Sequence, residues 1–529
     1  MNIIGSSNCL KVRALYWVLL VLSFGLAVCQ GQDDIKKLCD TGKYIPPFHP
    51  YVCNRTFYVS AATGSDSNDG SQLTPWATLQ QANNFGPIAG DCINVEPGVY
   101  TQPMNPYFGL ELTNGGNANT RAGYVTWISA VPHAAVIKGT PTSSQDYLVG
   151  VIGGSYIIFD GFEIDATGMP NTAAFGIDAF FGGTHHIMVI NNIIHNAGSA
   201  GISAILSDYY TFYGNDVYNN QFTSTVRSSG ISVYEPQPAT FTPTPEDEKK
   251  YHIVISHNIV HYNILTYPCT PDEIAQGING CPHSDGEGII LDNWSGSQTG
   301  RNPYPYSALV EDNLIFANGS AGVSVFEGGA EPGQIVTIRN NRVYNDWLDQ
   351  LSNIDSTGVA YADRGELQVY GSNNVAMDHN IAYALPVSHN SVLQYNESIF
   401  ETPQFNPTSS VNENVVWSGN DIHPKVGVAG FQYDDAAARL EAFNNDNSNG
   451  DARATCHDPG PYTTAVVNGV CGSANGSFAH DAPSGEHRCA VGQAVGLTGN
   501  NPWYWECTGS NGGLDASCST HSRERDNNR

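Results

Sequence analysis

The chain has 529 residues, which is too long for one compact core. It contains 22 basic and 50 acidic residues, so its formal net charge of -28 argues against nucleic acid or an anionic membrane surface as a partner. Only 14% of the residues are charged, whereas glycine occurs 55 times and tyrosine 27 times. This composition is typical of a β-rich exported protein and not of a helical bundle or a disordered tail.

The first thirty residues have the pattern of an export signal. Lys11 and Arg13 precede an apolar run over 14–28, and the chain becomes polar at Gln30. A membrane-spanning helix needs about twenty apolar residues, whereas a signal peptide needs fewer. A lipid anchor on Cys29 is disfavoured, because Val28 stands where a small residue is required. We therefore expect cleavage near Cys29 and secretion of the mature chain into the extracellular space.

Ten cysteines remain after the predicted signal peptide. They are Cys39, Cys53, Cys92, Cys269, Cys281, Cys456, Cys471, Cys489, Cys507 and Cys518. An even number in an exported chain predicts disulfides, and the lack of any Cys-x-x-Cys pair argues against a structural zinc site. Cys269 and Cys281 lie close together inside one expected loop, so we predict that they pair. The pairing among the last four cysteines stays open.

The middle of the chain repeats a short pattern in which Asn precedes two or three apolar residues and then an aromatic residue or His. The repeated positions are Asn192, Asn215, Asn258, Asn313, Asn341, Asn380 and Asn414. Three short strands separated by turns, with Asn at a fixed turn, are typical of one coil of a parallel β-helix. The side chains of stacked Asn residues can bond the same position of neighbouring coils. The period-two alternation excludes a helical solenoid.

A second repeated pattern, Gly followed by an alternating strand, sets the register of one sheet. Its copies start at Gly176, Gly201, Gly230, Gly288 and Gly322, and the last copy has Glu366 in place of Gly. The Ile, Val and Leu positions point inward, so the residues between them form an exposed face. On that face Asp292 is flanked by Tyr234 one coil before and by Phe326 one coil after. Coils stack about 4.8 Å apart, so these side chains should share one groove with Glu366.

The segment before the coils predicts a strand over 57–60 and a helix that closes the end of the solenoid. We expect this helix to run from Thr74, as N-cap, through Ala82, with Pro75 in its first turn. The opening FYVSAATGSDSNDGSQLTPWATLQQA, the Asn-rich coils and the export signal together resemble the secreted right-handed β-helix proteins of the pectin-lyase-like superfamily. The resemblance covers about 57–425. It implies an all-β fold, a right-handed single-stranded parallel β-helix (solenoid) of about a dozen coils. That superfamily includes lyases, hydrolases, epimerases and inert spikes, so the chemistry must be argued from residues.

Composition shifts divide the chain into six parts. They are a signal peptide (1–29), an N-terminal segment (30–56), the β-helix (57–430), a linker with a short helix (431–461), a cysteine-rich module (462–520) and a polar tail (521–529). The module resembles the short tail modules of secreted bacterial proteins and is expected to be a small disulfide-stapled β unit. In it Trp503, Tyr504 and Trp505 could form an aromatic platform for sugar, or a Trp could be core beside a disulfide.

The densest group of polar residues is CPHSDGEGIILDNW, over 281–294. It adjoins long insertions over 236–250, 265–282 and 295–307, and loops on one side of a solenoid build the walls of a cleft. The predicted disulfide would pin the 265–282 insertion and hold His283 and Asp285 in place. Taken alone, Asp285 and Asp292 could each belong to an ordinary turn, since both precede turn-forming residues.

A second polar group is DRGE, over 363–366, beside the 346–361 insertion. Here the large charged side chain of Glu366 replaces a repeated Gly. Arg364 is expected on the same side, where it could bind a carboxylate or sulfate of a substrate or orient a catalytic acid.

These groups predict a carbohydrate-active enzyme, with glycoside hydrolysis favoured. Hydrolysis needs two carboxylates about 5 to 9.5 Å apart, one of them protonated. The predicted catalytic residues are Asp285, Asp292 and Glu366. The predicted substrate-binding residues are His283, Arg364, Trp294, Tyr234, Phe326 and Tyr370. We expect a monomer that binds a polysaccharide and needs no cofactor or metal, although calcium is compatible with the acidic groups.

The runner-up is a lyase or epimerase that acts on a uronic-acid polymer, and the third hypothesis is a non-catalytic glycan-binding or surface spike protein. The calcium-dependent pectate lyases that the opening resembles use a Lys base within a coil. Here the lysines between Lys138 and Lys425 are Lys249 and Lys250, both in an insertion, and Ile290 or a neighbour stands at the matching position. A base at Arg364, His283 or Tyr370 would still permit elimination or epimerisation.

Overall fold

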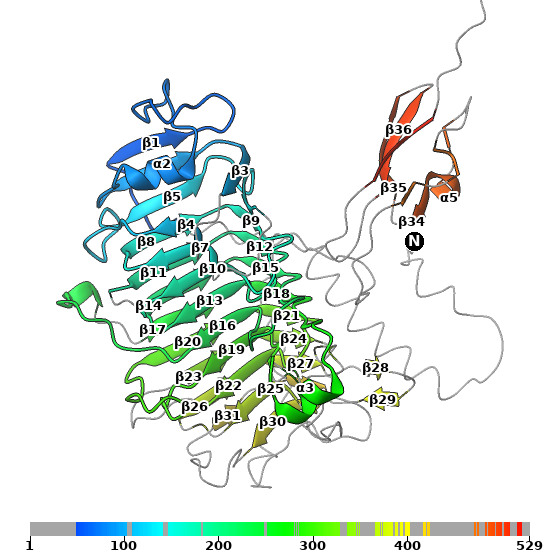
Figure 1. The fold of residues 1–529 in the computed structure, drawn as a ribbon. Helices are drawn as coiled ribbons and strands as arrows, with labels where there is room; N and C mark the ends of the chain where they lie inside the picture. Colours follow the sequence, from blue (N-terminus) through cyan, green and yellow to red (C-terminus); the bar gives the residue numbers. More distant parts are fainter. Residues whose placement is uncertain are drawn as a thin grey trace, which may run out of the picture. The chain divides into compact units, whose positions relative to one another are not determined.

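The structure is a computed structural model. It describes residues 49–102, 108–140, 147–180, 183–247, 251–279, 285–327, 336–344, most of 365–383, and short parts of 387–423 and 470–520, together with Cys281, His283, Asp346 and Asp349. Two units, Met1–Cys456 and His457–Arg529, are described each by itself. The larger unit is built from three long sheets, and every strand pair in these sheets is parallel (Figure 1).

Sheet 1 has 11 strands, sheet 2 has 10 and sheet 3 has 9. Sheet 1 consists of β1 (Arg55–Val59), β2 (Asp91–Val95), β5 (Val125–Ser129), β8 (Ser155–Asp160), β11 (His185–Ile190), β14 (Asp208–Tyr213), β17 (Tyr251–Ser256), β20 (Ser307–Glu311), β23 (Val336–Arg339), β26 (Val375–Asp378) and β31 (Val416–Ser418). Sheet 2 consists of β3 (Gly98–Gln102), β6 (Ala135–Gly139), β9 (Glu163–Asp165), β12 (Ile193–His195), β15 (Asp216–Tyr218), β18 (Ile259–His261), β21 (Leu314–Phe316), β24 (Arg342–Tyr344), β27 (Ile381–Tyr383) and β32 (Asp421–His423). Sheet 3 consists of β4 (Phe108–Leu112), β7 (Tyr147–Ile152), β10 (Ala173–Asp178), β13 (Ile202–Ile205), β16 (Ile231–Tyr234), β19 (Ile289–Asp292), β22 (Val323–Phe326), β25 (Gly365–Tyr370) and β30 (Glu397–Thr402).

The chain passes through sheets 1, 2 and 3 in turn and then starts the next coil, which confirms the predicted parallel β-helix. Inside, each strand contributes alternate apolar side chains. In β16, Ile231 and Val233 are fully buried, whereas Ser232 and Tyr234 point outward and are partly exposed. A core that repeats with each coil stabilises the solenoid, because each coil buries its apolar face against the next.

The repeated Asn residues form a continuous ladder at the turn between sheets 1 and 2. Its described members are Asn192, Asn215, Asn258, Asn313, Asn341 and Asn380. The Asn258 Nδ2 donates to the Phe212 carbonyl (2.9 Å) and to Asn313 Oδ1 (3.0 Å). The Asn258 Oδ1 accepts from the backbone N–H (3.0 Å) and Nδ2 (2.9 Å) of Asn215. The stacked side chains therefore satisfy buried backbone groups that the turn would otherwise leave unpaired.

A second ladder, which the sequence analysis missed, lies five residues after the first. Asn220, Asn263 and Asn318 repeat the same bonding between coils, and Asp346 takes the next position. The spacing was visible in the sequence, because each of these residues follows a first-ladder Asn by a constant offset. The ladder runs beside sheet 3 and so bears on the candidate site.

The helix near the N-terminal end of the solenoid starts later than predicted. It is α2 (Leu79–Asn84), and its N-cap is Thr78 and not Thr74. Trp76 instead pairs with Val59 as an isolated β-bridge, and its N–H donates to the Tyr58 carbonyl (3.0 Å). An extended residue at this place cannot belong to a helix, so the helix begins only after the bridge.

Further short elements lie outside the three sheets. They are the 3-10 helix η2 (Pro245–Asp247), the helix α3 (Pro271–Gln276) and the hairpin β28 (Val387–His389) and β29 (Val392–Gln394). Within the described parts of the chain, no helix is long and apolar enough to cross a membrane. The predicted signal peptide lies outside these parts.

Four disulfides are present in the described residues. Cys269–Cys281 confirms the predicted pair, and Cys53–Cys92 ties the segment before β1 to β2. In the smaller unit the pairs are Cys471–Cys518 and Cys489–Cys507, which answers the question that the sequence left open.

The smaller unit contains β33 (Val470–Cys471), α5 (Gly485–Arg488), β34 (Cys489–Val491), β35 (Ala494–Gly499), β36 (Trp503–Cys507) and β37 (Ala516–Ser519). Strands β35, β36 and β37 form an antiparallel sheet. Trp505 is 2% exposed and packs with cysteines of both disulfides, whereas Tyr504 on the same strand is 51% exposed. Trp505 is therefore a core residue beside the disulfides, which is one of the two alternatives predicted. The rings of Trp503, Tyr504 and Trp505 do not form one platform.

Replacing Asn258 by Ala should lower the free energy of unfolding by about 3 kcal/mol, because it leaves several buried donors and acceptors of the ladder without partners. Chemical denaturation measures this change. The matched control is Asn117→Ala, at an exposed asparagine, which should change stability by about 0.5 kcal/mol or less. Equal stability of the two variants would contradict the role given to the ladder.

Candidate active site

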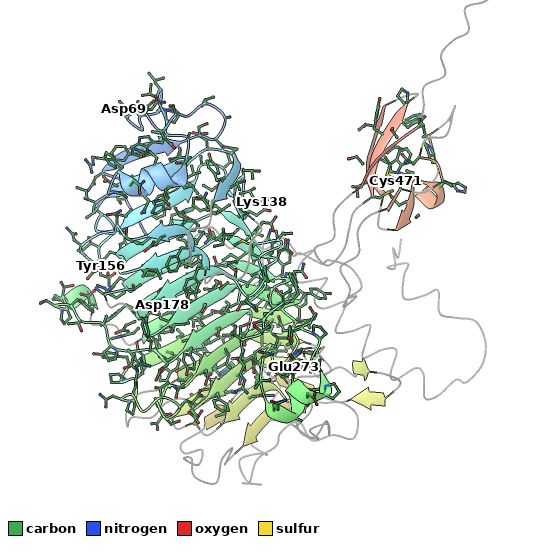
Figure 2. All side chains as sticks on the ribbon, in the orientation of Figure 1. Asp69, Lys138, Tyr156, Asp178, Glu273 and Cys471 are labelled. Carbon is green, nitrogen blue, oxygen red and sulfur yellow. A yellow bond between two sulfur atoms is a disulfide. The ribbon has the colours of Figure 1, made fainter. Side chains whose placement is uncertain are left out.

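A row of outward-facing side chains crosses sheet 3 where its strands end. The register pairs Tyr234 with Asp292 and Asp292 with Phe326, as the repeats predicted, and all three side chains are partly buried. The same row continues through Ile205 to Asp178, which is labelled in Figure 2. Here the predicted register is wrong by two residues, since Gly176 pairs with Ser203 and not with Gly201. The parallel register thus lines up residues that lie far apart in sequence.

Asp285 and Glu287 lie just before β19, and Asp292 ends this strand. Glu287 is 3% exposed, and its Oε2 accepts a hydrogen bond from the Ser229 hydroxyl (2.7 Å). Burial, followed by the negative charges of Asp285 and Asp292, raises the pKa of Glu287 well above its ordinary value. Compared with an ordinary glutamic acid, Glu287 therefore favours its protonated form, because the interior penalises a further negative charge beside Asp285 and Asp292.

Asp292 is the acidic side chain in the middle of the outward row. Burial and then the charge of Asp285 raise the pKa of Asp292 to about 8, and Glu327 adds to this rise. The amide of Gln298 opposes it by donating from Nε2 to Asp292 Oδ1 (3.0 Å). Asp292 thus retains a proton at neutral pH, which a general acid requires.

His283 lies in the interior, which corrects its predicted place against a substrate. It is 3% exposed, its Nδ1 lies 2.5 Å from Asp349 Oδ2, and its Nε2 lies 3.1 Å from the Tyr267 carbonyl oxygen. Both ring nitrogens are engaged, so His283 fastens the insertion that the Cys269–Cys281 disulfide also closes. The insertion is pinned as predicted, but its histidine does not face the groove.

The Trp294 ring is also in the interior and is 1% exposed, which corrects its predicted role in stacking on a sugar. It packs edge-to-face against Tyr304, with ring centroids 5.5 Å apart. The preceding residue, Asn293, has a φ of 55°. This left-handed conformation redirects the chain after β19, so the next side chain turns inward.

Glu366 is fully buried, which corrects its predicted place in the groove. Its Oε2 accepts the backbone N–H of Asp346 (3.2 Å), and Asp346 Oδ1 accepts from the backbone N–H (2.7 Å) and Nδ2 (2.8 Å) of Asn318. Glu366 therefore lies at the end of the second Asn ladder. It is a structural residue and not a groove carboxylate.

The ladder also explains why Gly recurs at the position that Glu366 occupies. A Cβ on Gly230 would lie 2.7 Å from Asn263 Nδ2, and one on Gly288 would lie 2.9 Å from Asn318 Nδ2. A side chain therefore fits only where the ladder ends. Burial raises the pKa of Asp346 to about 7, so Asp346 and Glu366 hold a proton between them that two buried carboxyl groups need.

Arg364 lies outside the described residues, and so does the side chain of Tyr370. The backbone of Tyr370 in β25 pairs with Phe326, which places it next in the outward row.

Insertions adjoin sheet 3 at both ends of its strands. At the strand ends toward sheet 1, the 236–250 and 295–307 insertions are joined, since Gln237 Nε2 donates to the Asn302 carbonyl (3.4 Å). In addition, Arg301 Nη1 lies 2.8 Å from Oε2 of Glu235, which directly precedes the first insertion. At the strand ends toward sheet 2 lies the insertion with α3, whose Glu273 is labelled in Figure 2 and forms a capping box with Thr270. Adjacent long insertions were visible in the sequence, but their mutual contacts were not.

Within the described residues, two groups of His, Cys, Asp or Glu side chains approach closely enough to share a metal ion. They are Cys269, Cys281 and His283, and Cys471, Cys507 and Cys518. The cysteines of both groups are in disulfides and cannot act as thiolate ligands. These groups therefore do not form metal sites.

Comparison with known families agrees with this architecture. Residues 133–382 match the family model of a right handed beta helix region. The repeated part of the chain is a right-handed parallel β-helix. No curated protein sequence matches the chain.

Several solved structures are similar to this chain at low sequence identity. Pectate lyase Pel9A is 17% identical over 72% of this chain and 81% of that chain, with a TM-score of 0.39. The A-module of the Azotobacter vinelandii mannuronan C-5 epimerase AlgE4 is 11% identical over 71% and 91%, with a TM-score of 0.42. The GH136 lacto-N-biosidase from Eubacterium ramulus is 16% identical over 70% and 68%, with a TM-score of 0.38. The likeness concerns the fold alone, and their names assign them different reactions.

Replacing Asp346 by Asn should raise the melting temperature of the β-helix at about pH 8 by about 2–4 °C and have little effect at about pH 4. The native pKa of Asp346 is raised, so the stability that its protonation provides is complete below the ordinary value of about 3.9 and is lost as the pH rises through about 7. An Asn continues the ladder without needing that proton. Thermal unfolding at the two pH values measures the effect.

Asp69→Asn, an exposed acid in the turn before α2, serves as the control and should show no gain at the higher pH. A gain for Asp346→Asn that is the same at both pH values would contradict the shared proton.

Proposed function

We propose that this β-helix is a secreted enzyme that cleaves a polysaccharide bound across the outer face of sheet 3, with glycoside hydrolysis favoured. The observation that carries the proposal is Asp292, whose raised pKa of about 8 keeps it protonated in the middle of the outward row. The four disulfides support export, because disulfides persist in oxidising compartments.

The chemistry requires one protonated and one ionised carboxyl group. Asp292 supplies the proton to the glycosidic oxygen as the bond from that oxygen to the sugar carbon breaks. Asp285, which is partly exposed, acts as the nucleophile or as the base that activates water. If Asp285 is the nucleophile, Asp292 then takes a proton from the water that breaks the bond between the sugar carbon and Asp285. If Asp285 is the base, it takes the proton of water itself, and solvent returns a proton to Asp292. In both cases the net reaction adds one water across the glycosidic bond. Glu287, held by Ser229, lies in the interior and takes no part in these proton transfers.

Tyr234 and Phe326 flank the acid on the neighbouring coils and offer ring faces that can stack on sugar rings. Because the coils are spaced by about 4.8 Å, these rings would contact a chain that lies along the solenoid axis. A polymer is therefore a better fit than a single sugar.

The charges around the acid favour a neutral polysaccharide over a uronic-acid polymer. The described groups whose charges act on Asp292 and Tyr234 are Asp285, Glu327, Glu235 and Arg301. Arg301 is paired with Glu235, so the local balance is negative. A uronate would be repelled there, and lyase chemistry needs a cation to neutralise the carboxylate beside the abstracted proton. This balance makes the lyase or epimerase the second candidate.

A polysaccharide panel, scored for new reducing ends and for ultraviolet absorbance from an unsaturated sugar, separates the candidates. Reducing ends without absorbance would support hydrolysis, and both signals together would support a lyase. Binding with neither signal would favour the non-catalytic spike.

Asp292→Asn and Asp285→Asn should each lower kcat by at least about a hundredfold on the cleaved substrate, because each removes one of the two carboxyl groups. Initial rates of reducing-end release measure the effect. Asp69→Asn, at the N-terminal end of the solenoid, is the control and should keep the native rate (Figure 2). Full activity of both site variants would refute the assignment, whereas Glu366→Gln should remain active because Glu366 is buried at the end of the ladder.

The rate should fall as the pH rises through about 8, since above this pH Asp292 loses the proton that it donates. A profile of kcat/KM against pH measures this limb. An activity that stays constant well above this pH would exclude Asp292 as the acid.

A further inference from the structure

The chain forms a tight turn directly after Asp292. The backbone N–H of Gly296 donates to the Asn293 carbonyl (3.1 Å), and that of Gly300 donates to the Gly296 carbonyl (2.8 Å). The backbone N–H of Gln298, in the middle of this turn, donates to Asn293 Oδ1 (3.2 Å). The turn therefore brings Gln298 back toward the end of β19, although its side chain lies in an exposed segment.

Two hydroxyl groups tie this turn to the neighbouring coils. Ser297 Oγ donates to Glu327 Oε2, and Thr299 Oγ1 donates to Glu235 Oε1. Glu235 and Glu327 occupy the same place in the coils before and after β19, each directly following the outward row, with φ values of 49° and 51°. Gln298 thus lies between two ties, one to the coil before and one to the coil after.

Gln298 contacts the outward row at Asp292. Its Nε2 donates to Asp292 Oδ1 (3.0 Å). We propose that Gln298 is a positioning residue that keeps Oδ1 of Asp292 as the acceptor and so leaves Oδ2 as the oxygen that carries the transferable proton. This inference rests on the proposed function of Asp292 as the general acid.

The reason is the hydrogen-bonding capacity of the two groups. An amide nitrogen can only donate, and a protonated carboxyl group has one accepting oxygen and one O–H. When Oδ1 accepts from Gln298, the proton must reside on Oδ2. A carboxyl group without this contact could exchange the two oxygens and would present its proton to the substrate only part of the time.

The effect of Gln298 on the pKa of Asp292 can be measured, because it is opposite to the effect of the neighbouring acidic groups. Asp285 before β19 and Glu327 after β22 both raise the pKa of Asp292, and Tyr234 and Glu287 also lie within its electrostatic reach. Gln298 and, to a smaller extent, the backbone N–H of Asn293 oppose these groups, because hydrogen-bond donation favours the ionised carboxylate. Removing the amide should therefore raise the pKa of Asp292 further.

The experiment follows Asp292 directly in the full-length protein labelled with carbon-13 at the Asp carboxyl group, with the signal assigned by Asp292→Asn. Gln298→Ala should raise the pKa of Asp292 by about one unit, the scale of one hydrogen bond to a charged group. On the cleaved substrate, kcat should fall about tenfold while KM stays unchanged. The control is Gln80→Ala on α2, which removes a partly exposed amide that contacts Asn84 and should leave both quantities at their native values.

The outcomes separate this inference from the proposed function. A raised pKa together with a lower kcat supports both. A raised pKa in a protein that cleaves no polysaccharide supports the contact between Gln298 and Asp292 but overturns the proposed function. An unchanged pKa of Asp292 in Gln298→Ala overturns the inference, whatever the rate.

Discussion

The Asn ladders are the interaction on which the rest of this structure depends. Each coil buries a turn whose backbone groups would otherwise lack partners, and the Asn side chains satisfy them by bonding the same position of the next coil. The bonding works only when coils stack in register. That register is what places Tyr234, Asp292 and Phe326 side by side, although up to 58 residues separate neighbours in the row. The ladders thus determine which residues are neighbours in the outward row.

The second ladder also decides which positions of sheet 3 can carry a side chain. Gly is required where the strand begins, because a Cβ would meet the ladder amides. At the last described step Asp346 replaces Asn, and Glu366 replaces Gly. One substitution accommodates the other, since the pair shares a proton in the interior. Acidic side chains therefore have two different roles in this protein: Glu366 closes a structural ladder in the interior, whereas the partly buried Asp292 lies in the outward row with a raised pKa.

Insertions turn a regular solenoid face into a site. The coils differ mainly in the length of the connections between their strands. The long insertions are grouped on the coils around β19. At the strand ends toward sheet 1, Arg301 in the 295–307 insertion contacts Glu235, which directly precedes the 236–250 insertion. At the strand ends toward sheet 2, a disulfide and the contact between His283 and Asp349 hold the segment that leads to Asp285. Asp285 and Asp292 therefore lie beside insertions that are held in place at both ends of the sheet 3 strands.

The sequence by itself determined the β-helix, the first ladder, the row through Asp292 and the Cys269–Cys281 disulfide. These features follow from local spacing, because a periodic pattern repeats in every coil and fixes which residues share a face. Only the tertiary structure decided that Trp294 and Glu366 point inward. The direction of Trp294 depends on the left-handed backbone at Asn293, and that of Glu366 on where the ladder of other coils ends. Contacts between distant coils set both directions, and a local pattern contains no information about them.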